Sequence, residues 1–309
     1  MTGYEIRYGK ADVRVYRTHG TPLRGVTAIP ESPFVGRENI LMAAELEVAV
    51  HGSAFLDAYT QGDNRLVVAT DTMKNFMHSA TLASSAATLE GWLFDVGSDF
   101  LAAYPHMERL TMSGRELPFP AALVPSDDGD GFTTSEVLFA RDRNDRSTAS
   151  LDLERHEDGV RIAGHGCGRT DLQLIKITGS AFADFARDEH TTLPERRDRP
   201  LYIWFDVGWR YADAADAIGT DPARYVAGEQ VADLAASVFH EFVSLSIQHL
   251  VNEIGTRMLQ RWPQLAEVSF EATNRLWDPG AELPADPKVK TYADPRPPFG
   301  RIGLVMRRE

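Results

Sequence analysis

Hydrophobic and polar residues alternate in several short stretches of the chain. Apolar side chains occupy every second position in residues 13–15 and 46–50, with charged or small residues between them. A period of two is typical of a β-strand that buries one face. In the second half, residues 172–177 and 201–205 are predicted as further strands on the same grounds.

A second pattern steps by three and four residues, the spacing of an amphipathic helix. Apolar residues 73, 76, 77 and 80 mark one such helix. Two more helices share one spacing: the apolar positions are Leu89, Leu93 and Val96 in the first, and Ile247, Val251 and Ile254 in the second.

These last two helices indicate an internal duplication. Residues 96–105 align with residues 254–263 at a constant offset of 158, and each segment ends in an aromatic residue followed by proline. Alternating apolar residues then predict a strand in each copy, at residues 110–112 and 268–270. Strands, helices and strands in each half predict an α+β fold of antiparallel sheet with helices on one face.

The domain boundary is predicted in the charged, turn-like stretch 141–146. This divides the chain into a first domain, 1–145, and a second domain, 146–309.

Three further predictions concern short segments that contain or adjoin candidate functional residues. Residues 66–69 are expected to form a short strand that leads into two capping residues, Thr70 and Asp71, and then a helix. The glycine-rich stretch 164–168 is expected to be a turn between strands, and residues 182–185 a short helical piece.

Composition excludes several classes of function. The formal net charge of −13 argues against nucleic acid or an anionic membrane as a partner. No apolar run approaches the ~18 residues of a membrane span. The single cysteine, Cys167, fits a reducing compartment, and the bacterial cytoplasm is the simplest expectation.

The sequence offers no recognisable metal or cofactor motif. The nine histidines are scattered, and His240-Glu241 has Ser244 where a zinc-binding pair needs its second histidine. We therefore expect no metal and no cofactor, which is unusual for oxidation chemistry.

Several longer segments resemble those of one family, in the same order along the chain. They are Tyr8-Gly9-Lys10, residues 59–64 with 66–76, Phe182 with 187–193 and Asp198-Arg199, Ser246-Ile247-Gln248, Asn274 and residues 295–300. Together they resemble urate oxidase (uricase), in its bacterial branch. The resemblance implies two tandem tunnelling-fold (T-fold) domains, whose sheets close into a barrel in a homotetramer with active sites between subunits.

The resemblance also implies a reaction and its residues. Uricases oxidise urate with O2 and water to 5-hydroxyisourate and H2O2 without a cofactor. Lys10 and Thr70 match the proton relay, and Asn274 the amide near oxygen and water. Substrate-binding positions matched here are Thr70, Asp71, Phe182, Arg199, Ile247, Gln248 and Asn274.

One departure leaves alternatives open. Many uricases have Asn-Lys-His where this chain has Asn274-Arg275-Leu276, and leucine cannot relay a proton. The competing hypotheses are a purine- or pterin-binding T-fold enzyme of other chemistry, and a non-catalytic urate-binding protein.

Overall fold

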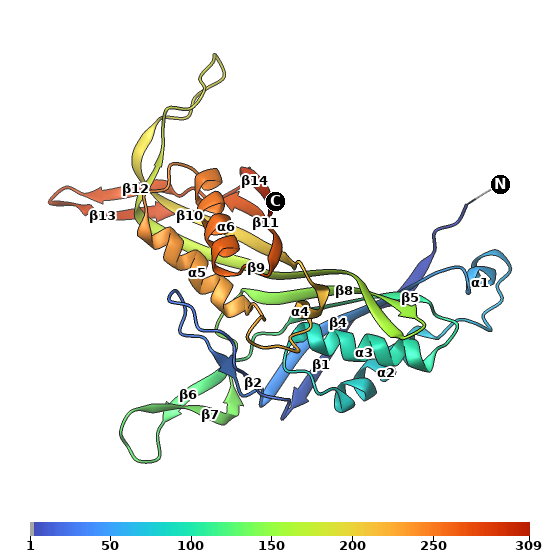
Figure 1. Cartoon of the computed structure of the whole chain (residues 1–309). Helices are drawn as coiled ribbons and strands as arrows, with labels where there is room; N and C mark the ends of the chain where they lie inside the picture. The colour runs from blue at the N-terminus through green and yellow to red at the C-terminus, as the bar shows by residue number, and fades with distance from the viewer. Residues whose placement is uncertain (1–2) are drawn as a thin grey trace.

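The computed structural model describes residues 3–309, and an eight-stranded antiparallel sheet runs through it (Figure 1). Its strands, in spatial order, are β1 (Arg7–Thr18), β4 (Leu41–His51), β5 (Arg109–Glu116), β8 (Arg146–His156), β9 (Gly159–Phe182), β10 (Arg196–Tyr211), β11 (Leu265–Asn274) and β14 (Arg301–Arg307).

The predicted alternation sets the register of these strands. Val13 lies opposite Leu46 in the pairing of β1 with β4, and both side chains are buried. The register shifts between Lys10 and Val13, where β1 carries an irregularity. The strands predicted at 172–177 and 201–205 are parts of β9 and β10. The predicted α+β architecture is thus confirmed.

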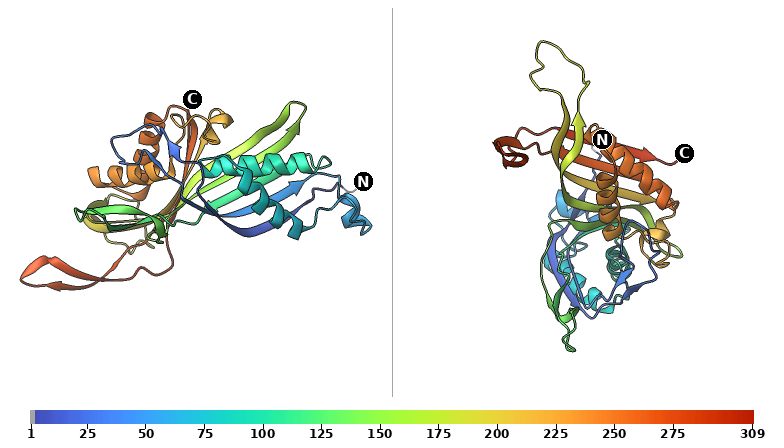
Figure 2. Two further views of the ribbon diagram at one scale, coloured as in Figure 1. Left: turned by 90° about the horizontal axis from the view of Figure 1, so that it is seen from below. Right: turned by 90° about the vertical axis from the view of Figure 1, so that its left-hand side faces the viewer.

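Helices cover one face of the sheet in two pairs, one behind the other along its length (Figure 2). In the first half, α2 and α3 share a core with β1, β4, β5 and β8. In the second half, α5 and α6 share a core with β10 and β11. The helices are α1 (Leu56–Thr60), α2 (Thr70–Ala83), α3 (Leu89–Ala103), α4 (Ala214–Ala217), α5 (Gly228–Glu241) and α6 (Ile247–Arg261).

The bounds of α3 and α6 differ by 158 residues at both ends, as the duplication predicts. Their caps correspond as well. The Thr88 side chain accepts a hydrogen bond from the backbone N–H of Gly91, and the Ser246 side chain accepts one from that of His249. Such caps satisfy N–H groups that have no partner within the helix.

The strands that follow these helices end alike in the two halves. Beyond β5, the backbone N–H of Leu117 donates to the carbonyl of Ala43 at 2.8 Å. Beyond β11, the backbone N–H of Arg275, 158 residues later, donates to the carbonyl of Tyr202 at 2.9 Å. The repeated unit therefore includes a helix, a strand and the residue that leaves the strand.

The sheet is continuous across the middle of the chain. Leu151 and Leu153 of β8 belong to the core of the first half, and β9 pairs with β8 on one side and with β10 on the other. The division between residues 145 and 146 stays a prediction.

The segment before α2 differs from its prediction. Residues 66–69 form no strand: the Val68 N–H donates to the Tyr8 hydroxyl at 2.8 Å instead of to a neighbouring strand. Thr70 and Asp71 are not caps but the first residues of α2. Ala69 holds the N-cap position, without a side-chain hydrogen bond.

Two predictions in β9 were also wrong. Residues 164–168 are not a turn but part of the strand. A Cβ at Gly168 would lie 2.7 Å from Thr148 Oγ1 on β8, so glycine allows the strands to approach here. Phe182 ends β9, and residues 183–185 are irregular rather than helical. Phe185 stacks on Phe182 with centroids 4.9 Å apart.

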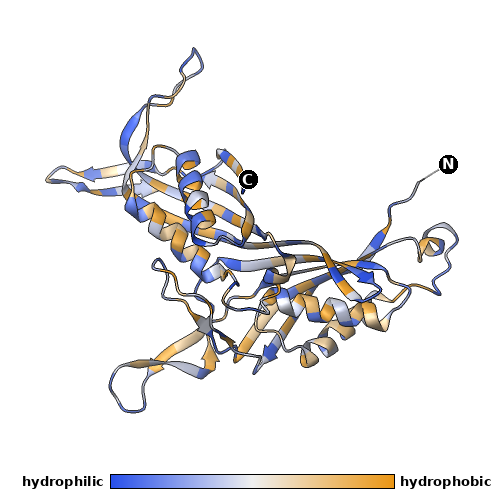
Figure 3. Cartoon of the chain, in the orientation of Figure 1, coloured by the Kyte–Doolittle hydropathy of each residue, from blue (hydrophilic) through white to orange (hydrophobic). Residues whose placement is uncertain are grey.

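Short strands make the remaining pairs. Figure 3 colours the chain by hydropathy, and hydrophobic and hydrophilic residues alternate along the strands of the large sheet. The short strands are β2 (Leu23–Arg24), β3 (Gly36–Arg37), β6 (Ala121–Pro125), β7 (Phe132–Phe139), β12 (Asp278–Leu283) and β13 (Asp286–Ala293). Hairpins β6–β7, β9–β10 and β12–β13 project from the body (Figure 1). Within residues 3–309, no helix has the length and apolar character to cross a membrane.

Candidate functional site

Phe182 and Arg199 lie together at the outer ends of β9 and β10. The backbone of Arg199 pairs with Ser180, and the guanidinium carbon lies 5.4 Å from the centroid of the Phe182 ring. Both side chains are partly buried. An aromatic face beside a planar cation is a surface on which a flat, anionic ring can lie.

Arg199 Nε, and Asn274 Oδ1 at the end of the neighbouring strand β11, are buried without a hydrogen-bond partner among the described residues. Burial also lowers the pKa of Arg199. Asn274 pairs with Ile203 on β10, four residues along the strand from Arg199. Buried polar groups normally have partners. Seven other buried side-chain atoms of the described residues also lack one, and among the arginines in this set Arg199 is the one that lies beside an aromatic ring.

The start of α6 is joined to the same end of β9. The Ala181 N–H donates to the Ser244 carbonyl at 2.8 Å, and the two buried hydroxyls of Ser244 and Ser180 bond at 3.1 Å. This fixes the approach to α6, where Ile247 is buried and Gln248 is exposed. The first N–H groups of a helix have no partner within it and are available to a ligand.

Lys176 on β9 also supports this approach, and sequence reasoning missed it. Its ammonium group donates to the carbonyls of Phe239 and Phe242, each at 2.8 Å, at the end of α5. A lysine at this position stabilises the free carbonyls of a helix C-terminus. Nothing in the local sequence of a strand lysine signals such a role. The Ser180–Ser244 pair was missed for the same reason.

The remaining predicted residues form a second group, in the first half. Thr70 begins α2 and is exposed. Hydrogen bonding from Lys74, at 2.6 Å, is the main cause that lowers the pKa of Asp71, and the charge of Lys10 adds to it. Lys10 is on β1, the strand on which α2 packs, so the predicted relay residues Lys10 and Thr70 belong to neighbouring elements.

The two groups lie in different parts of the chain. α2 packs on β1 and α3, whereas α6 packs on α5, β11 and β14. Figure 1 shows these helix pairs in separate halves of the molecule. Phe182, Arg199, Ile247, Gln248 and Asn274 thus make one group, and Lys10, Thr70 and Asp71 another.

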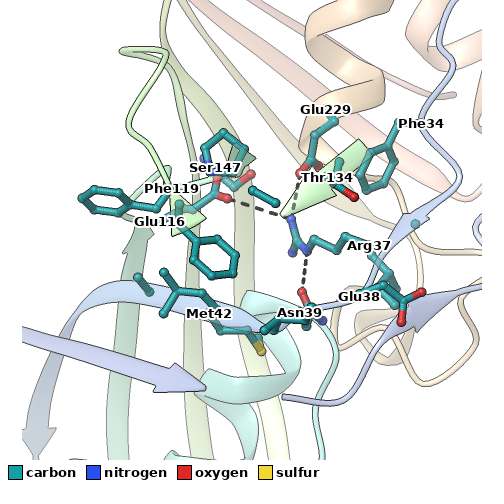
Figure 4. A pocket seen from close by; sticks show the side chains of 18 of the residues that line it. Phe34, Arg37, Glu38, Asn39, Met42, Glu116, Phe119, Thr134, Ser147 and Glu229 are labelled. Atoms are coloured by element: carbon teal, nitrogen blue, oxygen red, sulfur yellow. Dashed lines mark hydrogen bonds and ion pairs between the residues drawn. The ribbon is translucent and has the colours of Figure 1, made fainter. Parts of the chain in front are cut away.

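A cavity of about 810 Å³ lies elsewhere, where the segment 34–44, hairpin β6–β7 and α5 meet (Figure 4). Arg37 reaches into it and donates to Glu229 Oε1 at 2.7 Å, and Glu116 Oε1 lies 3.9 Å away. Arg143 also lies 3.5 Å from Glu116, so these four charged groups are paired with one another, and no predicted site residue lines the cavity. Among residues 3–309 no three His, Cys, Asp or Glu side chains gather as metal ligands.

Comparison with known proteins finds similarity to one family. The family model described as Uricase matches residues 6–148 and again residues 165–303. A uricase from Halalkalicoccus jeotgali is 46% identical over 98% of this chain and 98% of its own length.

Solved structures agree with the sequence comparison. The urate oxidase from Bacillus sp. TB-90 superposes with a TM-score of 0.93 at 44% identity, covering 98% of this chain and all of that one. A uricase from Bacillus fastidious gives a TM-score of 0.94 at 43% identity, covering 99% of this chain and 94% of that one.

The full-length Bacillus sp. TB-90 relative is a longer protein, named uric acid degradation bifunctional protein. It is 45% identical over 97% of this chain, which spans 60% of that relative's length. With two matches to the family model and relatives alike over nearly its whole length, the chain belongs to the uricase family.

Proposed function

We propose that this chain oxidises urate: urate, O2 and H2O give 5-hydroxyisourate and H2O2. The observation that carries the proposal is the position of Arg199, whose Nε has no partner among the described residues, beside the Phe182 ring, with the unpartnered Asn274 Oδ1 on the neighbouring strand. A planar purine anion has acceptors for the guanidinium fork and a face for the ring. The names of the family relatives point to the same substrate.

Each binding residue would contact a different part of the substrate. Arg199 would bind one edge of the ring and Gln248 the opposite edge, since an amide both donates and accepts. Ile247 would offer its backbone N–H at the start of α6. Asn274 would hold O2, and then water, over the exposed face of the ring.

Proton transfer is assigned to the first-half group. Lys10 and Thr70 would take up and return the proton that urate loses before it gives an electron to O2. The backbone beside Asp71, at the N-terminus of α2, would help to hold the anion, because helix N-termini attract negative charge. No cofactor takes part in this scheme.

Because the two groups lie in separate halves, we propose that each site combines the first-half group of one subunit with the second-half group of another. The assembly would be a homotetramer in which the free edges of β1 and β14 meet strands of neighbouring copies and close a barrel. For the location of the enzyme, we propose the cytoplasm.

The test follows urate loss, O2 uptake and peroxide release by the purified protein, before and after exhaustive chelation with metal analysis. Full activity after chelation is expected. Activity lost on chelation and restored by one metal would contradict the cofactor-free scheme. Urate that binds but is not consumed would favour a binding protein, and hydrolysis without O2 uptake would favour other T-fold chemistry.

A further inference from the structure

Arg275, the residue after Asn274, lies between two aromatic rings. Its guanidinium carbon is 4.1 Å from the centroid of Trp204 on β10 and 3.7 Å from that of Phe299, which precedes β14. We call these three side chains the Arg275 stack. Within residues 3–309 no carboxylate lies within ion-pair distance of Arg275; besides the two rings, its Nε donates to Thr273 Oγ1 at 3.3 Å.

The backbone on both sides of Asn274 is bonded to the segments that carry these rings. The Asn274 N–H donates to the carbonyl of Gly300, next to Phe299, at 3.1 Å. The Arg275 N–H donates to the carbonyl of Tyr202, two residues before Trp204. A shift of the Arg275 stack would therefore move the backbone of Asn274.

The Asn274 side chain depends on that backbone for its position. Its Oδ1 is buried without a hydrogen-bond partner among the described residues, so no polar contact holds the oxygen in place. Consecutive side chains of a strand point to opposite faces. Arg275 lies on the face of Trp204, away from Asn274, and would act through the main chain rather than on the substrate.

The duplicated half shows that the fold does not require arginine here. Leu117 occupies the equivalent position after β5 and makes the equivalent backbone hydrogen bond, to Ala43 at 2.8 Å. The chain therefore leaves the strand with the same kind of backbone hydrogen bond when leucine occupies this position. What distinguishes the second half is the pair of rings around the guanidinium.

We infer that Arg275 is a positioning residue that, through the Arg275 stack, holds the Asn274 amide where O2 and water react. The inference rests on the proposed function. A planar guanidinium can contact two ring faces at once, whereas the ammonium of lysine cannot.

The experiment compares Arg275→Leu, Arg275→Lys and Phe299→Leu with wild type. Arg275→Leu introduces the residue of the first half and is expected to fold, which the melting temperature checks. In all three, kcat should fall on the order of 5- to 20-fold, with KM for urate within about twofold of wild type. Arg161→Lys, on an exposed ion pair of β9 with Glu154, is the control and should change neither constant.

A double-mutant cycle tests whether the effect passes through Asn274. In an Asn274→Ala background, Arg275→Leu should lower kcat by less than about twofold, because the residue that it positions is gone. The inference would be overturned if Arg275→Leu lowered kcat by the same factor in the Asn274→Ala background as in wild type. A wild-type kcat in Arg275→Lys would overturn it too.

Hydrogen exchange gives a readout that needs no activity. Backbone amides of residues 270–276 should exchange faster in Arg275→Leu than in wild type, while those of residues 110–118 should not change. Equal exchange in both segments would contradict the role of the Arg275 stack. If wild type left urate unchanged, the proposed function would fail, and this measurement would still decide whether the stack holds Asn274.

Discussion

The hydroxyl of Tyr225 donates a hydrogen bond of 3.0 Å to Oε2 of Glu90, and so joins the second half of the chain to the first turn of α3. Glu90 is only 2% exposed, and burial raises its pKa to about 7. A carboxyl with a raised pKa keeps its proton in the folded state while the unfolded chain loses it.

The first prediction follows from the upward direction of the Glu90 pKa shift. The free energy of unfolding should fall as pH rises from about 4.5 to about 7 and then level off, by about 3 kcal/mol from this group. Glu90→Gln, neutral throughout, should lack that fall. Urea unfolding at pH 5 and pH 8 measures it, with the exposed Glu157→Gln as control. A parallel decline in Glu90→Gln and wild type would show that Glu90 is not the source.

The second prediction concerns Arg199. Arg199→Ala should raise KM for urate about tenfold or more, because charge-assisted hydrogen bonds contribute roughly 1.5–3 kcal/mol. Steady-state kinetics measure it. The control is Arg197→Ala, on the same strand but 75% exposed and paired with Asp184. Unchanged urate affinity in Arg199→Ala would mean that the anion is held elsewhere.

The third prediction concerns Lys10. Lys10→Met should lower kcat by about 10²–10⁴-fold with little change in KM, since a proton-transfer group acts on the transition state more than on binding. Lys288→Met, on the exposed strand β13, controls for loss of a positive charge. An unaltered kcat would show that the proton takes another path.

The fourth prediction tests sites shared between subunits. Mixing Thr70→Ala chains with Arg199→Ala chains should restore part of the activity, because some sites would then combine two intact groups. Mixing Thr70→Ala with Lys10→Met should restore none, since both changes affect the same group. Failure of the first mixture, after subunit exchange is demonstrated by mass, would count against shared sites.

The fifth prediction concerns Leu276, which stands where many uricases have histidine. If Lys10, Thr70 and water complete the relay, Leu276→His should leave kcat within about twofold of wild type. Turnover measured over a range of pH checks this. A large gain would show that the native relay is incomplete.

The strands and helices that sequence predicted share one property: each buries a single face. Segments in which apolar residues recur every second position lie in β1, β4, β9 and β10. Segments in which they recur every three or four positions form α2, α3 and α6. The duplication was visible because corresponding helices, caps and strands kept one offset.

The failures have physical causes that local sequence does not record. Residues 164–168 read as a turn because glycine favours turns, yet here glycine leaves room between close strands. Residues 66–69 have the composition of a strand, but their backbone bonds to a side chain, Tyr8, from a distant segment. Lys176 and the Arg275 stack depend on neighbours more than 20 residues away along the chain.

The offset of 158 residues also shows how two copies of one unit diverged. It relates Gln248 to Glu90, and Asn274 to Glu116. The later pair lies at the proposed urate site; the earlier pair is bonded within the protein, Glu90 to Tyr225 and Glu116 to Arg169. The two carboxylates of the earlier copy thus join the halves, while the two amides of the later copy are left for the substrate. Libraries that seek activity on other purines should therefore vary Gln248 and Asn274 and keep Glu90 and Glu116, because those carboxylates bind Tyr225 and Arg169.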